Sequence, residues 1–315
     1  MSASLAFVFP GQGSQSLGML AELGAQQALV RDTFAEASEA LGYDLWALVQ
    51  NGPEEHLNQT DKTQPAILTV SIALWRLWLA EGGARPAFVA GHSLGEYSAL
   101  EAAGVFTAKQ AIELAAYRGK AMADAASGID CGMTAVLNLD RVPLAECCEQ
   151  ASALGCVQIC NYNCPGQLVI GGEKAAVDKA AELAKQAGAR RCIPLKVSGP
   201  FHTRLMAPAG DALAKRFAAE PFGEMSVPVL FNCLGREKAE SDSIPALLVR
   251  QVQSSVYMED TLHRLGELGV DHILEVGPGN ALSGFVKKTL PGVTCVSVET
   301  PAQLDTVLNA WKEEQ

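Results

Sequence analysis

Residues 88–103 read FVAGHSLGEYSALEAA, and this stretch decides the fold class. An apolar run, Phe88–Ala90, leads into the pentapeptide Gly91-His92-Ser93-Leu94-Gly95, and a helical pattern follows. The pattern G-x-S-x-G requires that order, because a strand and a helix that meet at a sharp turn push the serine above a sheet. A chance pentapeptide in a loop would lack these flanking elements. The stretch predicts a nucleophile elbow at Ser93, with the Leu94 N–H at a helix N-terminus where it can stabilise an oxyanion.

The segments on either side of the elbow alternate between strand, loop and helix. Leu5–Phe9 is a short apolar strand followed by a tight glycine-rich loop, and Ala108–Ala126 has helical periodicity. Apolar strands recur towards the C-terminus at Val229–Asn232 and His272–Val276. This alternation predicts an α/β domain with a largely parallel sheet.

The rhythm of the sequence changes between residues 130 and 197. The expected elements are strand, helix, strand, strand, helix and strand, over Met133–Leu137, Pro143–Ala153, Val157–Tyr162, Leu168–Ile170, Ala175–Ala187 and Cys192–Val197. The order βαββαβ is typical of a ferredoxin-like unit. We therefore expect a discontinuous large domain over residues 1–129 and 198–315, with a small ferredoxin-like domain inserted at 130–197.

Composition indicates a globular protein and excludes several kinds of partner. Of the 315 residues, 49% are hydrophobic and 19% are charged, which is an ordinary globular balance. The formal net charge of −11 argues against nucleic acid or an anionic membrane as the main partner, because both require basic patches. The first residues lack a signal peptide pattern, and the apolar run Ala66–Ala80 is interrupted by Ser71 and Arg76. We expect a soluble, cytoplasmic protein.

The nine cysteines are an odd number, so at least one thiol is unpaired, and without an export signal reduced thiols are expected. Cys156, Cys160 and Cys164 recur every four residues, which would also suit a metal site. A predicted strand covers this segment, however, and residues four apart in a strand share a face where cysteine packs as a small hydrophobe. No C-x-x-C motif or histidine cluster accompanies them, so we expect no metal.

A nucleophilic serine needs a base, and the chain offers five histidines: His56, His92, His202, His263 and His272. His202 lies in the loop Ser198–Thr203, just past the predicted strand Cys192–Val197. Sites of α/β proteins gather at the carboxyl ends of strands, so His202 is the candidate base. The alternative is a residue at a helix N-terminus with no catalytic role.

Arg118 stands alone among apolar neighbours on the predicted helix Ala108–Ala126. At 100° per residue, it shares a face with Ala111, Leu114, Ala115 and Met122. A buried cation is costly unless it meets an anion or a polar network. The position suits a fork-shaped clamp for a substrate carboxylate, or, alternatively, a structural ion pair with a buried carboxylate.

Several motifs, in order over nearly the whole chain, resemble the malonyl-CoA:acyl carrier protein transacylases. They are Val8-Phe9-Pro10-Gly11-Gln12-Gly13-Ser14-Gln15, Gly91–Glu96, Tyr117–Met122, Asn161–Gln167, the pair Phe201-His202, and Glu275–Gly279. The resemblance implies an α/β-hydrolase-like large domain with a ferredoxin-like insert. It also implies transfer of malonyl from malonyl-CoA to acyl carrier protein, in fatty acid or polyketide biosynthesis, with no cofactor.

The resemblance assigns roles to individual residues. It implies that Ser93 becomes malonylated, that His202 is its general base, and that Gln12 and the Leu94 N–H form the oxyanion hole. A backbone carbonyl orients the histidine in this family, and Gln251 matches that position, although Gln253-Ser254-Ser255 departs from the more usual Tyr-Asn-Pro. The residues expected around the substrate are Gln64, Arg118, Met122, Asn161 and Phe201.

Three other functions remain open from the sequence. A hydrolase would share the elbow but has no need of an inward-facing Arg118. An NAD-binding module would require G-x-G-x-x-G, and Ser16 stands at the third glycine position. A carrier-binding module without activity would not need both Ser93 and His202.

Overall fold

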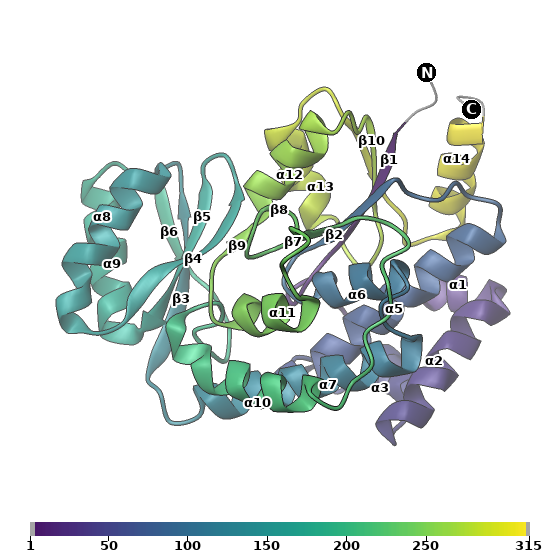
Figure 1. The fold of residues 1–315 in the computed structure, drawn as a ribbon, viewed down its shortest axis with the longest axis horizontal. Coiled ribbons are helices and arrows are strands. Elements are labelled where there is room, and N and C mark those ends of the chain that lie inside the picture. The colour runs from purple at the N-terminus through teal and green to yellow at the C-terminus, as the bar shows by residue number, and fades with distance from the viewer. Residues whose placement is uncertain (1–3, 313–315) are drawn as a thin grey trace. The chain divides into compact units, whose positions relative to one another are not determined.

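The computed structural model describes residues 4–312 and divides into two compact units (Figure 1). The first unit consists of Met1–Gly119, Pro221–Phe231 and His263–Gln315. The second consists of Lys120–Glu220 and Asn232–Leu262, and it contains the whole of the predicted small domain. Within residues 4–312, no helix combines the length and apolar character that crossing a bilayer requires.

A parallel sheet forms the centre of the first unit. Its strands lie in the order β11-β10-β1-β2-β7, with bounds Thr294–Ser297, His272–Glu275, Leu5–Phe9, Phe88–Gly91 and Val229–Phe231. Every residue of β1 is buried. An apolar run without alternation is what a parallel strand covered on both faces requires. The mixed α/β class predicted from the sequence is therefore confirmed.

The helices of the first unit include one that is buried along most of its length, α5 (Thr60–Ala80). Phe7 on β1 meets Trp75 and Trp78 of α5 edge-on, with ring centroids 5.6 and 6.1 Å apart. Such aromatic contacts tie the helix to the centre of the sheet. The other helices are α1 (Ala21–Gln26), α2 (Ala28–Leu41), α3 (Leu45–Asn51), α4 (Glu54–Leu57), α6 (Gly95–Ala102), α13 (Ala281–Thr289) and α14 (Pro301–Lys312), while α7 (Ala108–Ala126) and α12 (Met258–Glu267) each belong in part to both units.

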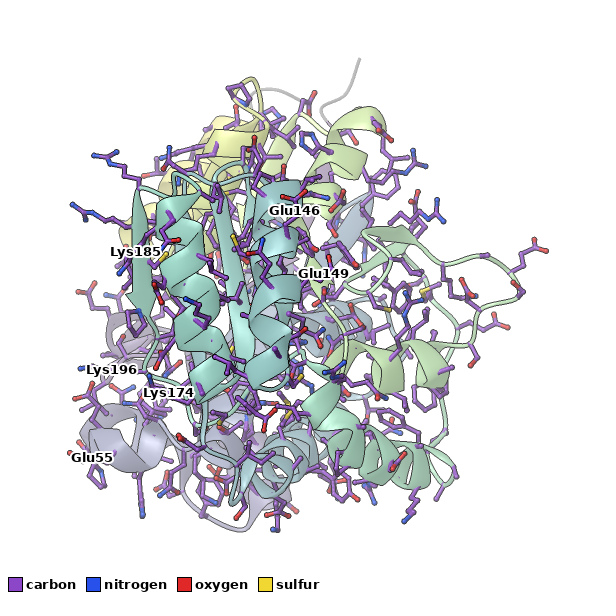
Figure 2. The ribbon with its side chains drawn as sticks, turned by 90° about the vertical axis from the view of Figure 1, so that its left-hand side faces the viewer. Glu55, Glu146, Glu149, Lys174, Lys185 and Lys196 are labelled. Atoms are coloured by element: carbon purple, nitrogen blue, oxygen red, sulfur yellow. The ribbon has the colours of Figure 1, made fainter. Side chains whose placement is uncertain are left out.

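The second unit is built on a mainly antiparallel sheet of order β6-β3-β5-β4-β9. The strands are β3 (Cys131–Leu137), β4 (Val157–Cys164), β5 (Gln167–Glu173), β6 (Arg191–Pro194) and β9 (Val256–Tyr257), and the unit also contains β8 (Arg236–Glu237). Helices α8 (Arg141–Ala151) and α9 (Lys174–Gln186) bury apolar residues together with β3, β4 and β5, and Figure 2 shows the two helices in front of the sheet. The remaining elements are η1 (Ser152–Leu154), η2 (Arg204–Met206), α10 (Ala207–Phe217) and α11 (Ile244–Val252).

The strand expected before His202 is shorter than predicted. It ends at Pro194 rather than Val197, and the residues that follow are exposed. Proline has no N–H to donate to a sheet, so it limits the ladder at this point. His202 therefore lies eight residues beyond a strand, in a turn before η2, and not directly at a strand end.

Candidate functional site

Ser93 lies on a sharp turn between a buried strand and a helix of the first unit. Strand β2 ends at Gly91, and α6 begins at Gly95 with Leu94 as its N-cap. Ser93 has φ 55°, a left-handed conformation that costs energy for a residue with a side chain. This is the strand–turn–helix arrangement that a nucleophile elbow requires, and it places the Leu94 N–H at the first turn of a helix.

The glycines around the turn are required by close backbone contacts. A Cβ at Gly91 would lie 1.9 Å from the carbonyl carbon of Gly95, and one at Gly95 would lie 2.0 Å from the Phe9 oxygen. A Cβ at Gly11 would lie 2.4 Å from the His92 oxygen. Only glycine allows these approaches. The loop after β1 therefore packs directly on the elbow.

Gln12 belongs to this same loop. Its Nε2 donates to Thr60 Oγ1 over 3.4 Å, at the start of α5, and Ser14 Oγ donates to the Gly11 oxygen over 2.8 Å. The loop is thus fixed at both ends, against the elbow and against α5. This position beside the elbow is compatible with the oxyanion role expected for Gln12.

Arg118 connects three elements of the first unit at one point. Its side chain is fully buried; Nη1 donates to Gln64 Oε1 over 2.7 Å, and Nη2 donates to Ser93 Oγ over 3.1 Å. A Cβ at Gly119 would lie 2.4 Å from the Thr60 oxygen, so glycine lets α7 approach α5. That close approach is what brings Arg118 beside Gln64.

The electrostatic surroundings of Arg118 come from the first turn of α6. Burial lowers the pKa of the guanidinium, while Tyr97 and the carboxylate of Glu96 act in the opposite direction. Both residues are fully buried, and the guanidinium carbon lies 5.4 Å from the centroid of the Tyr97 ring. Burial raises the pKa of Tyr97, which keeps its hydroxyl protonated. Arg118 therefore has both a polar network and a buried carboxylate in its surroundings.

His202 lies in the second unit, almost completely buried and also in a left-handed conformation, with φ 59°. Its Nδ1 donates to the backbone oxygen of Gln251 on α11 over 2.9 Å, the contact that the resemblance implies. Thr203 Oγ1 donates to the Pro200 oxygen over 2.6 Å and closes the turn that carries the imidazole. With Nδ1 carrying the proton, Nε2 is left as the basic nitrogen.

The other expected substrate residues of the second unit are buried. Phe201 precedes His202 and is 6% exposed, and the adjacent chain passes so close that a Cβ at Gly199 would lie 2.7 Å from the Phe201 ring. Asn161 on β4 and Met122 on α7 are 5% and 1% exposed.

The ten expected site residues fall into two groups of five. Gln12, Gln64, Ser93, Leu94 and Arg118 lie in the first unit, where contacts between the loop, α5, the elbow and α7 gather them. Met122, Asn161, Phe201, His202 and Gln251 lie in the second, where a hydrogen bond joins His202 to the backbone of Gln251.

Sequence reasoning missed three residues that contact or surround the first group. They are Thr60, which holds Gln12, and the pair Glu96 and Tyr97 beside Arg118. A signal for Glu96 was available, because it is an acidic residue directly after the elbow, at the start of the predicted helix.

The nine cysteines show no sign of a metal site. All nine are thiols, and in the part of the chain that the structure describes no group of three histidine, cysteine or acidic side chains is placed to hold a metal ion. Cys160 is buried, and its Sγ donates to the Val169 oxygen over 3.3 Å, as a strand residue packed in a core would.

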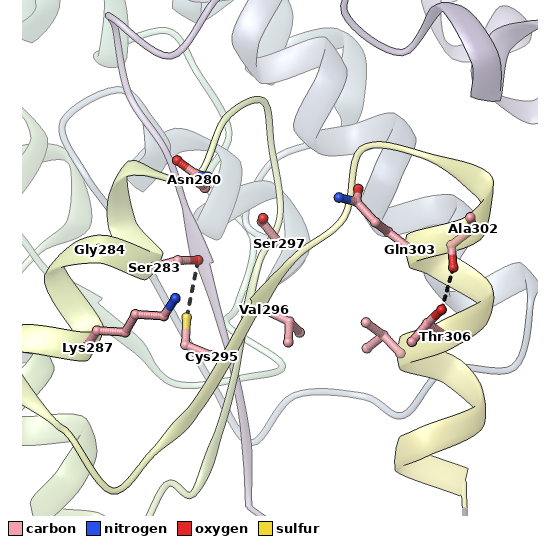
Figure 3. Close-up of a pocket in the computed structure, with 11 residues that line it drawn as sticks. Asn280, Ser283, Gly284, Lys287, Cys295, Val296, Ser297, Ala302, Gln303 and Thr306 are labelled. Atoms are coloured by element: carbon pink, nitrogen blue, oxygen red, sulfur yellow. Dashed lines mark hydrogen bonds between the residues drawn. The ribbon is translucent and has the colours of Figure 1, made fainter.

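A cavity of about 560 Å³ opens elsewhere in the first unit, between α13, β11 and α14 (Figure 3). Lys287 and Ser283 line it from α13, and the Sγ of Cys295 donates to Ser283 Oγ over 3.4 Å. None of the ten expected site residues lines this cavity, so it is separate from the elbow.

Comparison with known proteins places these features in a family. Residues 6–313 match the family described as acyl transferase domain. The chain is 48% identical over 303 residues to the malonyl CoA-acyl carrier protein transacylase of Salmonella typhimurium, covering 96% of this chain and 98% of the relative. It is 41% identical over 313 residues to the protein of the same name from Bacillus subtilis, covering 99% and 98%.

Solved structures agree. The crystal structure of an acyl carrier protein S-malonyltransferase from Vibrio cholerae has a TM-score of 0.93 at 47% identity, covering 97% of this chain and 100% of that one. A malonyl-transacylase in complex with its type II PKS acyl-carrier protein has a TM-score of 0.95 at 45% identity, covering 98% and 100%. The chain therefore belongs to the malonyl CoA-acyl carrier protein transacylase family.

Proposed function

We propose that this chain transfers malonyl from malonyl-CoA to the phosphopantetheine thiol of an acyl carrier protein, through a malonyl-serine at Ser93, in fatty acid or polyketide biosynthesis. The relatives from Salmonella typhimurium and Bacillus subtilis are named for that activity, and this chain matches nearly their whole length. One observation supports the choice of acyl group: a buried guanidinium, that of Arg118, donates to the Oγ of the elbow serine. A site for uncharged acyl groups has no need of a cation at that point.

In the first half-reaction, Ser93 Oγ attacks the thioester carbonyl carbon of malonyl-CoA while His202 accepts the hydroxyl proton. The negative charge that develops on the carbonyl oxygen is stabilised by Gln12 and the Leu94 N–H. The C–S bond then breaks, and the proton held by His202 goes to the departing thiolate of coenzyme A. Malonyl-serine remains.

In the second half-reaction, the phosphopantetheine thiol of the carrier gives its proton to His202 and attacks the acyl-serine carbonyl. The C–O bond to Ser93 breaks, and the serine oxygen regains the proton. The bond from His202 Nδ1 to the Gln251 oxygen supports this role, because it fixes the tautomer in which Nε2 can accept a proton.

Arg118 binds the free carboxylate of the malonyl group in this proposal. Its guanidinium presents two Nη groups side by side, a geometry that suits a bidentate bond to carboxylate. Gln64 holds one of these groups in position. Met122, Asn161 and Phe201 would complete the surroundings of the acyl group, and the reaction needs no cofactor.

The topology supports two finer structural proposals. The second unit is ferredoxin-like: β3, β4, β5 and β6 alternate with α8 and α9, and the order β6-β3-β5-β4 follows from that chain path. The first unit is α/β-hydrolase-like, given its parallel sheet and its elbow after β2. We also propose a cytoplasmic location.

Mass spectrometry after brief incubation with malonyl-CoA tests the proposal. We expect one malonyl group, on Ser93; the Ser93→Ala protein should gain none, and His202→Ala should gain it slower by orders of magnitude. Covalent malonate on Ser93→Ala protein would disprove the assignment. Adding carrier protein should then move the label to its thiol; release of free malonate instead would identify a hydrolase.

A further inference from the structure

The aromatic ring of Tyr97 lies against the guanidinium of Arg118. It lies in the first turn of α6, four residues after the elbow serine, and it is fully buried. One face of its ring lies 5.4 Å from the guanidinium carbon of Arg118. A cation within about 6 Å of a ring centroid is attracted by the negative face of the ring, more strongly when water is excluded.

Aromatic rings support Tyr97 in turn. Its ring stacks on Phe106, with centroids 6.2 Å apart and planes 19° from parallel, and Phe106 packs edge-on against Phe222 at 5.1 Å. These three rings, the aromatic column, belong to the first unit. The column fixes Tyr97 through packing that does not involve Arg118. It therefore gives the guanidinium a rigid surface to rest on.

The bonds of Arg118 need such a surface. Arginine has several rotatable bonds, and the bonds from Nη1 and Nη2 join the guanidinium to the side chains of Gln64 and Ser93. A carboxylate that forms a bidentate bond would compete for these same groups. When the bonds to Gln64 and Ser93 change, the contact between the guanidinium and the Tyr97 ring face can persist, because this attraction does not depend on the direction of any single N–H bond.

We propose that Tyr97 is a positioning residue for Arg118, holding the guanidinium so that its Nη edge faces the acyl group on Ser93. Glu96, the buried neighbour of Tyr97, supplies the negative charge that balances the cation before substrate arrives. The inference rests on the proposed role of Arg118 in binding the malonyl carboxylate. Tyr97 therefore contributes to the choice of malonyl over acetyl without touching the substrate itself.

The test compares kcat and KM for malonyl-CoA and acetyl-CoA in Tyr97→Met and Tyr97→Phe. Methionine keeps much of the volume but lacks a ring, so the malonyl-to-acetyl ratio of kcat/KM should fall about ten- to thirtyfold, mainly through KM for malonyl-CoA. Phenylalanine keeps the ring face, so Tyr97→Phe should keep the ratio within about threefold. Equal loss in both variants would overturn the ring-face account.

Phe106→Leu is the matched control, because it removes the other side of the stack without touching Arg118. It should lower the thermal midpoint and lower the malonyl-to-acetyl ratio by less than Tyr97→Met does, because the Tyr97 ring loses part of its support but remains beside Arg118. If Phe106→Leu and Tyr97→Met reduce both activities in equal proportion, Tyr97 is a packing residue and the inference is wrong. Should Tyr97→Met fail to fold, Tyr97→Leu measured with both malonyl-CoA and acetyl-CoA provides the same comparison.

Arg118→Ala separates this inference from the proposed function. If that variant leaves the malonyl-to-acetyl ratio unchanged, the role of Arg118 itself is disproved. If Arg118→Ala collapses the ratio but Tyr97→Met does not, only the role of Tyr97 is disproved. The double variant should have the ratio of Arg118→Ala alone, because a positioning residue has no effect once its target is gone.

Discussion

Arg118 donates a hydrogen bond from Nη2 to the Oγ of Ser93 over 3.1 Å. The guanidinium of Arg118 thus directly contacts the oxygen that is proposed to carry the acyl group. Malonyl extends beyond its carbonyl by one methylene and a carboxylate. A cation at this distance can therefore meet the far end of an acyl group on Ser93, and the acyl group must displace the existing contact to do so.

Replacing Arg118 by alanine should change the preference of the enzyme from malonyl to acetyl. The lost bond is charge-assisted and buried, so malonyl turnover should lose ~2–5 kcal/mol, roughly a hundredfold or more. Acetyl-CoA has no carboxylate and should retain its activity. The measurement is kcat/KM for both acyl-CoAs, with the thermal midpoint of each protein. Loss of both activities in equal proportion, together with a much lower midpoint, would make Arg118 a scaffold residue.

Phe201 should exclude an α-methyl group from the pocket. Phe201 directly precedes His202 and is 6% exposed, so a bulky side chain lies beside the proposed base. Since one methyl group accounts for only ~1–3 kcal/mol of discrimination, Phe201→Ser should relax the specificity and not invert it. Competition between malonyl-CoA and methylmalonyl-CoA measures this. An unchanged ratio would show that Phe201 does not set the specificity.

Acyl carrier protein should dock on the exposed cations Arg190, Arg191 and Lys196. No acidic side chain within the described residues forms an ion pair with these three, so they suit a partner with an acidic surface. Figure 2 labels Lys196 on the face that carries α8 and α9. Added salt should weaken transfer to carrier protein but not transfer to free pantetheine.

Charge reversal provides the control for this surface. Lys196→Glu should slow transfer to the carrier, whereas Lys179→Glu, at a lysine already paired with Glu182 at 3.0 Å, should change it little. If both acceptors are equally sensitive to salt, or if both variants slow transfer equally, the three cations are only a solvated surface.

Glu101 should make stability depend on pH near neutrality. Burial raises the pKa of its carboxyl from 4.5 to about 7, while Arg76 opposes the shift and Glu36 adds to it. The folded state thus favours the protonated form, and this stabilisation, complete below pH 4.5, is lost as the pH rises through about 7. The side chain of the Glu101→Gln protein does not titrate. Its free energy of unfolding should exceed that of wild type by about 1–3 kcal/mol at pH 8.

Urea unfolding at pH 5 and pH 8 measures the effect. The advantage of Glu101→Gln should be present at pH 8 and nearly absent at pH 5. Glu146→Gln, at an exposed position of α8, should match wild type at both values. An advantage of equal size at both pH values would show that Glu101 is ionised or protonated throughout.

Local patterns predicted the elbow and the class of fold because the constraints there are local. Gly91 is fixed by a backbone contact with Gly95, four residues further on, and a buried parallel strand such as β1 needs an unbroken apolar run. Arg118 could be identified as a candidate site residue because a charge on an apolar helix face needs an anion or a polar network beside it. The resemblance added Gln251, whose contribution is a backbone oxygen and leaves no trace in its side chain.

Other features depend on parts of the chain that are distant in sequence. Thr60 meets Gln12 from 48 residues away, and Tyr97 gains its role only when α7 brings Arg118 to its ring. The end of β6 was misplaced because Leu195 and Val197 continue the apolar pattern, although Pro194 limits the ladder. The hydrophobic periodicity of a single segment cannot predict contacts between residues that are distant in the sequence.

The burial of the thiols bears on the fidelity of the chemistry. Malonyl-CoA and acyl carrier protein are thioester carriers, and a protein thiolate could intercept the acyl group by thiol–thioester exchange. The thiolate is the reactive form, and burial raises the pKa of Cys148 to about 12, that of Cys295 to about 11, and that of Cys160 as well. At neutral pH these three sulfurs remain protonated, which protects them from acylation by activated thioesters.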